Sequence, residues 1–308
     1  MASRTADEFL AQHPELLDED ERSPELVRRV VELTAPLERY HRFECRGLER
    51  VPDGPVLLVA NHSAAAVQEI LLILRSWYLR FGERPARGLL HRAVYEFPFR
   101  QIPLLPRLGG VFAHPRVALR ALERGAALLV FPGGELSVCR PFSERHRILL
   151  GGRSGFLDLA RRARVPIVPL VVHGAHAAYV MLRGARRRAE LSGLGRLLGL
   201  KAVPMTVGGV VLAATLLVPP LWPLAPLAAA AALVPLPARI TAEALEPIPA
   251  SAVDEATVES VQAVMQRGMD RLVAERRRAR RAELEQWLGA RGASMQRAAR
   301  AIRHPWRS

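Results

Sequence analysis

The sequence predicts an α/β fold in which a mostly parallel central sheet is flanked by helices. Three uncharged runs, rich in aliphatic and β-branched residues, have the length of buried strands: residues 55–60, 126–131 and 165–172. Helical stretches alternate with these runs, which indicates crossover connections between parallel strands. Half of the 308 residues are apolar, so the chain is long enough to bury a large core.

Residues 1–40 are expected to form an N-terminal amphipathic helical segment. Ser23 is a suitable helix cap, and Pro24 suits the first helical position. Pro36 is expected to bend or end this helix. The apolar side chains that follow the cap recur at helical steps and predict one buried stripe: Leu26, Val27, Val30, Val31, Leu33 and Leu37.

A central domain is expected over residues 41–250. It begins with a short strand near residues 42–47 and continues with the buried strand at 55–60, which ends at Asn61 and His62. Helical composition continues from there to about residue 81. The order is therefore strand, polar corner, helix.

Two further units repeat this alternation. A helix near residues 117–124 leads into the strand at 126–131, which ends at the turn Pro132-Gly133-Gly134. A helix over residues 155–164 leads into the strand at 165–172.

Polar residues follow each predicted strand. Ligands of parallel sheets bind at the carboxyl ends of the strands. We therefore expect His62, the Pro-Gly-Gly turn and His173 to share one rim of the sheet.

Residues 202–238 contain no charged side chain but seven prolines. The longest proline-free piece would extend about 21 Å as a helix, whereas a hydrocarbon core is about 30 Å thick, so a single straight span is disfavoured. Two interpretations stay open. The segment is either a re-entrant or interfacial hairpin that contacts a membrane, with Trp222 at headgroup level, or an apolar insertion folded onto the sheet.

Residues 239–248 alternate in polarity and predict a final strand, and a long helix is expected from residue 253 to about 288. The C-terminal segment 251–308 becomes strongly basic from Arg276 onward. Such a segment either lies on an anionic bilayer or forms a solvated tail.

The formal net charge of +14 favours anionic partners. Nucleic acid is not expected, because no recognition motif accompanies the charge, which leaves an anionic membrane surface. Cys45 and Cys139 have no metal or redox spacing, and the N-terminus lacks the apolar run of a signal peptide. The cytoplasmic face of a membrane is the expected location, and a spanning segment within 202–238 stays open.

Motifs for other enzyme classes are missing from the sequence. It has no P-loop, no G-x-G-x-x-G after a strand, no H-E-x-x-H and no G-x-S-x-G elbow. We therefore expect no metal or resident cofactor and no serine hydrolase. His62 is the sharpest candidate, because a histidine at a sheet rim can act as a general base near neutral pH. A structural histidine is the alternative.

Five motifs carry a family resemblance, in this order: ANHS at 60–63, HRAVYEFPFRQIPLLPRLGGVFA at 91–113, ALERGAALLVFPGGELSVCRPFSERHRI at 121–148, GGRSGF at 151–156 and VPIVPLVVHGAH at 165–176. With them, residues 40–250 resemble the glycerolipid (lysophospholipid) acyltransferase superfamily, in its hemolysin-like and diacylglycerol-acyltransferase-like bacterial branch. The resemblance implies transfer of a fatty acyl group from coenzyme A or acyl carrier protein to a lipid hydroxyl. It places the general base on His62, without an acyl-enzyme.

The resemblance also implies substrate-binding residues. Ser63 follows the histidine, and Glu135 follows the glycine pair. The backbone N–H groups of Gly133 and Gly134 can approach an oxyanion or phosphate closely. A plain strand-ending turn is the alternative for the two glycines.

The first motif departs from the family pattern. The family has an aspartate five residues after the histidine, where this chain has Val67, and the nearest acid is Glu69. On a continuous helix the α-carbons of His62 and Glu69 would be about 10 Å apart, so contact requires a bend at residues 63–66. Glu69 is expected to orient His62. The alternatives are a surface glutamate or no partner.

The later motifs lack phosphate-clamping arginines. Leu136 stands at the third-motif position, and Pro115, beside Arg116, at the second. This favours an acceptor without phosphate, such as a diacylglycerol, over lysophosphatidic acid. Three other arginines are candidates to clamp a phosphate or coenzyme A, or else to form ordinary surface pairs: Arg145, Arg147 and Arg153. A catalytically degenerate relative that only binds membrane lipid is the alternative function.

Overall fold

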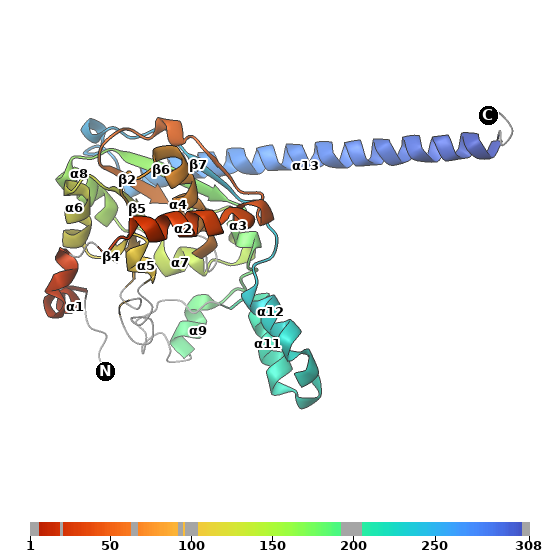
Figure 1. Ribbon diagram of the computed structural model, residues 1–308, viewed down its shortest axis with the longest axis horizontal. Coiled ribbons are helices and arrows are strands. Elements are labelled where there is room, and N and C mark those ends of the chain that lie inside the picture. Colours follow the sequence, from red (N-terminus) through yellow and green to blue (C-terminus); the bar gives the residue numbers. More distant parts are fainter. Residues whose placement is uncertain are drawn as a thin grey trace. The chain divides into compact units, whose positions relative to one another are not determined.

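The computed structural model describes residues 6–18, 21–62, 67–91, 95, 104–191 and 205–303 (Figure 1). The chain divides into two compact units, Met1–Met269 and Asp270–Ser308. This division falls inside the predicted C-terminal segment.

The first unit contains a seven-stranded sheet with the order β1-β7-β6-β2-β5-β3-β4. All neighbouring strands are parallel except β6 and β7, which are antiparallel. The predicted α/β class with a mostly parallel sheet is therefore confirmed. The strands are β1 Glu44–Arg46, β2 Val56–Ala60, β3 Ala86–Leu90, β4 Gly110–Phe112, β5 Ala127–Val130, β6 Ile167–His173 and β7 Thr241–Ala244.

Helices occupy most of the remaining described chain. The α-helices are α1 Ala6–Gln12, α2 Pro24–Leu33, α3 Ala35–Tyr40, α4 Val67–Phe81, α5 Leu104–Arg107, α6 Pro115–Glu123, α7 Gly134–Val138, α8 Gly155–Ala163, α9 Ala185–Leu191, α11 Val207–Leu217, α12 Ala225–Leu233 and α13 Val258–Arg303. Short 3-10 helices are η1 Pro14–Leu17, η2 Leu48–Arg50, η5 Phe142–Glu144, η6 Ala175–Ala177, η7 Pro219–Leu224 and η8 Ala250–Ala252.

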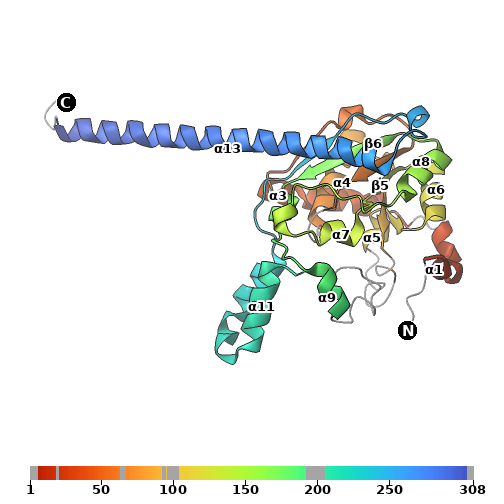
Figure 2. The ribbon, with the colours of Figure 1, turned by 180° about the vertical axis from the view of Figure 1, so that it is seen from behind.

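The central strand β2 is buried on both faces, as its uncharged run predicts. Alternate β2 side chains join a core cluster to which α4 contributes Leu72, Ile73 and Trp77. The opposite face of the sheet is covered by helices that include α8, which contacts β2. Helices α6 and α8 lie side by side in both views (Figures 1 and 2).

The N-terminal helix is capped and broken as expected. Ser23 Oγ accepts a hydrogen bond from Leu26 N, and the helix ends at Leu33, before α3 begins with Pro36 in its first turn. The buried stripe is narrower than predicted, because Leu33 is 77% exposed. Val27 and Val31 are buried instead, because the packed face is centred on them. The prediction that Leu33 belongs to this stripe is wrong.

The charge-free segment forms a helical hairpin of α11 and α12 joined by the proline-rich η7. The two helices pack closely, since a Cβ on Gly208 would lie 2.2 Å from Ala231 O. Its outer side chains are exposed, among them Leu216, Leu217, Leu221, Trp222, Leu224, Leu227 and Leu233. The segment is thus a hairpin with exposed apolar side chains rather than an insertion buried on the sheet, and its contact with a membrane stays a prediction. Within the described ranges, no helix combines the length and apolarity that crossing a membrane requires.

Candidate active site

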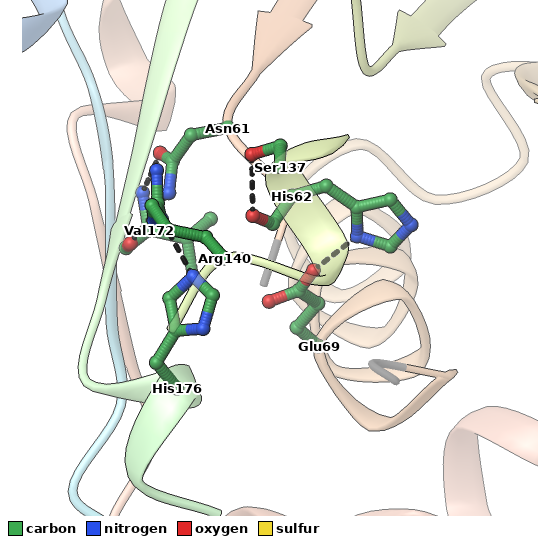
Figure 3. Close-up of polar contacts among 7 residues, drawn as sticks. All are labelled: Asn61, His62, Glu69, Ser137, Arg140, Val172 and His176. Carbon is green, nitrogen blue, oxygen red and sulfur yellow. Dashed lines mark hydrogen bonds and ion pairs between the residues drawn. The ribbon is translucent and has the colours of Figure 1, made fainter. Parts of the chain in front are cut away.

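Asn61 ties the end of β2 to β6. Its amide nitrogen Nδ2 donates to Val172 O at 2.9 Å, and Val172 N donates to Asn61 Oδ1 at 2.8 Å. A side-chain amide can donate one hydrogen bond and accept another, so it can pair with both the C=O and the N–H of one backbone residue. Asn61 thus takes over the pairing where β2 ends, and it fixes the position from which His62 leaves the sheet (Figure 3).

His62 faces Glu69, which lies in the first turn of α4 (Figure 3). The distance from His62 Nδ1 to Glu69 Oε1 is 2.8 Å. The carboxylate side chain is fully buried, and the imidazole side chain is 19% exposed. His62 itself lies outside any helix, so the 10 Å separation expected on a straight helix does not apply to this pair.

This contact sets the chemistry available to His62. When Nδ1–H donates to the carboxylate, Nε2 carries the lone pair and can accept a proton. A buried carboxylate at this distance is also able to stabilise an imidazolium. The predicted bend at 63–66, and Ser63 with it, lie outside the described residues.

The turn after β5 holds His62 from the other side. The Phe131 ring stacks on the imidazole, with ring centroids 4.4 Å apart and an interplanar angle of 26°. Ser137 Oγ, from α7, donates to His62 O at 2.9 Å. Both the ring plane and the backbone of His62 are therefore fixed by neighbours.

Gly133 and Gly134 are required by this turn itself. A Cβ on Gly133 would lie 2.2 Å from Leu149 O, and Gly134 has a φ of +48°. Gly134 N already donates to Phe131 O at 3.0 Å. The strand-ending turn thus explains both glycines, and their role toward substrate stays a prediction. The side chain of Glu135 lies outside the described part of α7.

A buried pair next to the site, Arg140 and His176, escaped the sequence reasoning. Arg140 is 2% exposed, and its Nη2 donates to His176 Nε2 at 2.5 Å (Figure 3). Burial lowers the pKa of Arg140 to about 10, against the opposing attraction of Glu144 and Glu69. Burial and the Arg140 charge lower the pKa of His176 to about 2, so His176 stays neutral and accepts this hydrogen bond.

The sequence offered only a weak signal for this pair. His176 follows β6 in a short 3-10 turn, and Arg140 follows α7. Both residues follow a strand or helix that ends at the same rim of the sheet. Many other arginines and histidines of this chain also follow a strand or helix, so this position alone does not single out the pair.

The three candidate clamp arginines have different environments. Arg145 lies over the Phe142 ring at 4.2 Å, and its Nη1 donates to Phe142 O. Arg147 Nη1 lies 3.9 Å from Glu144 Oε2. Arg153 Nη1 lies beside Gly134, 2.8 Å from where a Cβ would stand.

The second predicted strand-end histidine, His173, closes β6 and is buried, and its ring centroid lies 5.4 Å from that of His146. Asn61 pairs with the preceding residue, Val172, so the ends of β2 and β6 do meet at one rim.

Comparisons with known proteins identify proteins that are similar to this chain. Residues 42–173 match the Acyltransferase family. An uncharacterized protein of Mycobacterium tuberculosis is 31% identical over 205 residues, which are 65% of this chain and 50% of that protein. A DGAT1/2-independent enzyme synthesizing storage lipids from Gallus gallus is 28% identical over 148 residues, 48% of this chain and 43% of that protein. The chain thus spans about half the length of these curated relatives.

One solved structure shares the fold. The 1-acyl-sn-glycerophosphate (LPA) acyltransferase PlsC from Thermotoga maritima aligns over 80% of each chain with a TM-score of 0.50 and 17% identity.

Proposed function

We propose that this protein is a membrane-associated enzyme that transfers a fatty acyl group from an acyl thioester to a glycerolipid hydroxyl. The match of residues 42–173 to the Acyltransferase family supports this proposal. The observation that carries the proposal is the 2.8 Å contact between His62 Nδ1 and the buried Glu69 carboxylate. That contact presents His62 Nε2 as a base at the rim of the sheet.

The reaction follows from this geometry. The acceptor hydroxyl gives its proton to His62 Nε2 while its oxygen attacks the thioester carbonyl. Glu69 stabilises the imidazolium through Nδ1–H. The tetrahedral intermediate then expels the thiolate, which takes the proton back from Nε2. General base catalysis of this kind contributes about 10²–10⁴-fold to the rate.

The acceptor we propose is a neutral glycerolipid, such as a diacylglycerol. Leu136 stands at the position where the family resemblance leads us to expect a phosphate-clamping arginine, so the turn itself supplies no guanidinium there. The storage-lipid name of the Gallus gallus relative supports the same acceptor class. The donor is an acyl chain on coenzyme A or on acyl carrier protein.

The membrane contact is assigned to the hairpin of α11 and α12. An exposed apolar surface of this kind is rare on soluble monomers, and it gains free energy when lipid covers it. The arginines of α13 add attraction to anionic lipid on the cytoplasmic face. Trp222, exposed in η7, suits the headgroup level.

The assay that tests this function measures thiol release from a long-chain acyl-CoA by the purified protein, with separate lysophospholipid, monoacylglycerol and diacylglycerol acceptors. We expect release that depends on a neutral glyceride acceptor. Acyl carrier protein replaces coenzyme A as donor in a parallel series. Vesicle binding without release in either series would contradict the enzyme and favour the degenerate lipid-binding relative.

A further inference from the structure

An open cavity of about 660 Å³ adjoins α7 and the start of α9. Leu136 and Arg140 line it from α7 and the residue stretch that follows. Ser137 lies next to Leu136 and donates to His62 O. The cavity therefore borders the element that holds the backbone of His62.

The cavity lining is strongly basic. Four arginines line it, against the single carboxylate of Glu144: Arg140, Arg147, Arg183 and Arg187. The remaining wall is mainly apolar, with Leu136, Cys139 and Leu149. A concave surface with one sign of charge and apolar walls concentrates a positive potential and attracts anions.

Within the part of the chain that the structure describes, the guanidinium of Arg140 has one nitrogen without a hydrogen-bond acceptor. The side chain is 2% exposed, and its Nε has no hydrogen-bond partner among the described residues. A buried donor without an acceptor destabilises the fold. An anion in the cavity would compensate the charge, and its oxygens are acceptors suited to guanidinium forks.

We propose that this cavity binds a phosphate group of a substrate, with Arg183 and Arg187 as its principal ligands. Both side chains are exposed, so they are accessible to a ligand. The inference rests on the proposed acyl transfer, in which the acceptor is neutral and coenzyme A is the substrate that carries phosphate. A phosphorylated lipid acceptor is the other outcome that the test distinguishes. Arg140 and Arg147 follow α7 and η5, Arg183 precedes α9 and Arg187 lies in α9, so a leucine at position 136 does not leave the cavity without cations.

Binding of two probes separates the two sources. Coenzyme A and a short-chain lysophosphatidate are titrated by calorimetry into the wild type and into the double variant Arg183→Gln/Arg187→Gln. The matched control is Arg80→Gln/Arg162→Gln, which removes the same charge from two exposed arginines outside the cavity lining. Loss of two charge-assisted contacts predicts a dissociation constant at least about tenfold higher in the cavity variant only.

Each outcome decides the proposal. Weakened binding of coenzyme A alone assigns the cavity to the donor, and weakened binding of lysophosphatidate alone assigns it to the acceptor. Equal affinities in wild type, cavity variant and control overturn the proposal, and so does a wild type that binds neither probe. Because this measurement needs no turnover, arginine-dependent binding by an inactive wild type would reject the acyl transfer while supporting the phosphate site.

A misfolded variant would be revealed by its thermal unfolding. We expect the midpoint of the double variant to match that of the wild type, since both arginines are exposed. If it is lower, the single variant Arg187→Gln replaces the double variant, and an affinity for both probes equal to that of the wild type then overturns the proposal.

Discussion

The contact between His62 and Glu69 joins a residue at a strand end to a residue on the following helix. The imidazole needs a partner at Nδ1 to present Nε2 as a base, and Glu69 is fully buried at 2.8 Å from that nitrogen. Glu69 acts through His62 in this account, so it is a positioning residue.

Glu69→Gln keeps the size of the side chain and removes its negative charge. The variant imidazolium loses its counter-charge, so we expect kcat to fall at least about 10²-fold with little change in KM. Steady-state kinetics with acyl-CoA measure both constants. The matched control is Glu243→Gln, at a second buried glutamate, which lies on β7 and pairs with Arg50 of η2. A kcat loss equal in the two variants would assign Glu69 a general structural role.

His176 makes a prediction about acid stability. Its pKa is about 2 in the folded protein, against 6.5 for the free side chain, because it is buried beside Arg140. Below pH 6.5 the unfolded chain takes up a proton that the folded chain refuses, so stability falls as the pH falls, by up to about 1.4 kcal/mol per pH unit.

Replacement of this histidine should remove that slope. Chemical denaturation between pH 7 and pH 5 should show a shallower loss of unfolding free energy in His176→Gln than in the wild type, since glutamine does not titrate. His13→Gln, at a histidine whose side chain is 27% exposed, is the matched control. Parallel profiles for wild type and His176→Gln would contradict the buried neutral state.

At the scale of elements, the turn between β5 and α7 supports the site. Gly133→Ala would place a Cβ 2.2 Å from Leu149 O, so the turn must shift. We expect a loss of about 1–3 kcal/mol in unfolding free energy and reduced turnover, because Phe131 and Ser137 both contact His62.

Gly155→Ala is the matched control for this turn. Nothing lies within 4 Å of its Cβ position, and its φ is not positive. Alanine at the first residue of α8 should leave stability unchanged or raise it by up to about 1 kcal/mol. Equal thermal midpoints for the two variants would show that the turn tolerates a side chain at position 133.

The hairpin of α11 and α12 is the element assigned to lipid. Leu217 and Leu227 are 81% and 71% exposed, so Leu217→Asp and Leu227→Asp should leave thermal stability unchanged. Each should weaken sedimentation with anionic vesicles about tenfold or more, since a buried leucine contributes about 1.5–3 kcal/mol. Leu79→Asp, at an exposed leucine of α4, is the control.

Salt separates the two modes of vesicle binding. Binding by the hairpin should persist at high salt, whereas binding by the arginines of α13 should be lost as salt screens their charge. If the hairpin variants sediment as the wild type does at high salt, the hairpin is not the lipid contact.

On the scale of the whole molecule, the pattern of the sequence predicts the sheet but not all of its strands. Uncharged aliphatic runs identify β2, β5 and β6, because a strand buried on both faces needs them. The strands β3 and β4 escape this reasoning, since Ala86–Leu90 contains an arginine and a glycine and Gly110–Phe112 is three residues long. Their strand conformation depends on pairing with β5 and with each other.

The sequence likewise predicts only some features of the candidate site. A histidine at the end of a buried strand can be located from sequence, because strand ends in a parallel sheet meet at one rim. The contact with Glu69 depends on the chain path between His62 and α4, which helical periodicity alone does not give. Arg140 and His176 are recognised only by their burial and mutual contact, which a single sequence does not display.

The most direct test of the central claim is thiol release from long-chain acyl-CoA with the preferred acceptor, compared between wild type, His62→Ala and the control His13→Ala. We expect acceptor-dependent release by wild type and control, and a rate at least about 10²-fold lower in a folded His62→Ala variant whose vesicle binding is unchanged. Release by a folded His62→Ala at the wild-type rate would contradict the role of His62 as the general base.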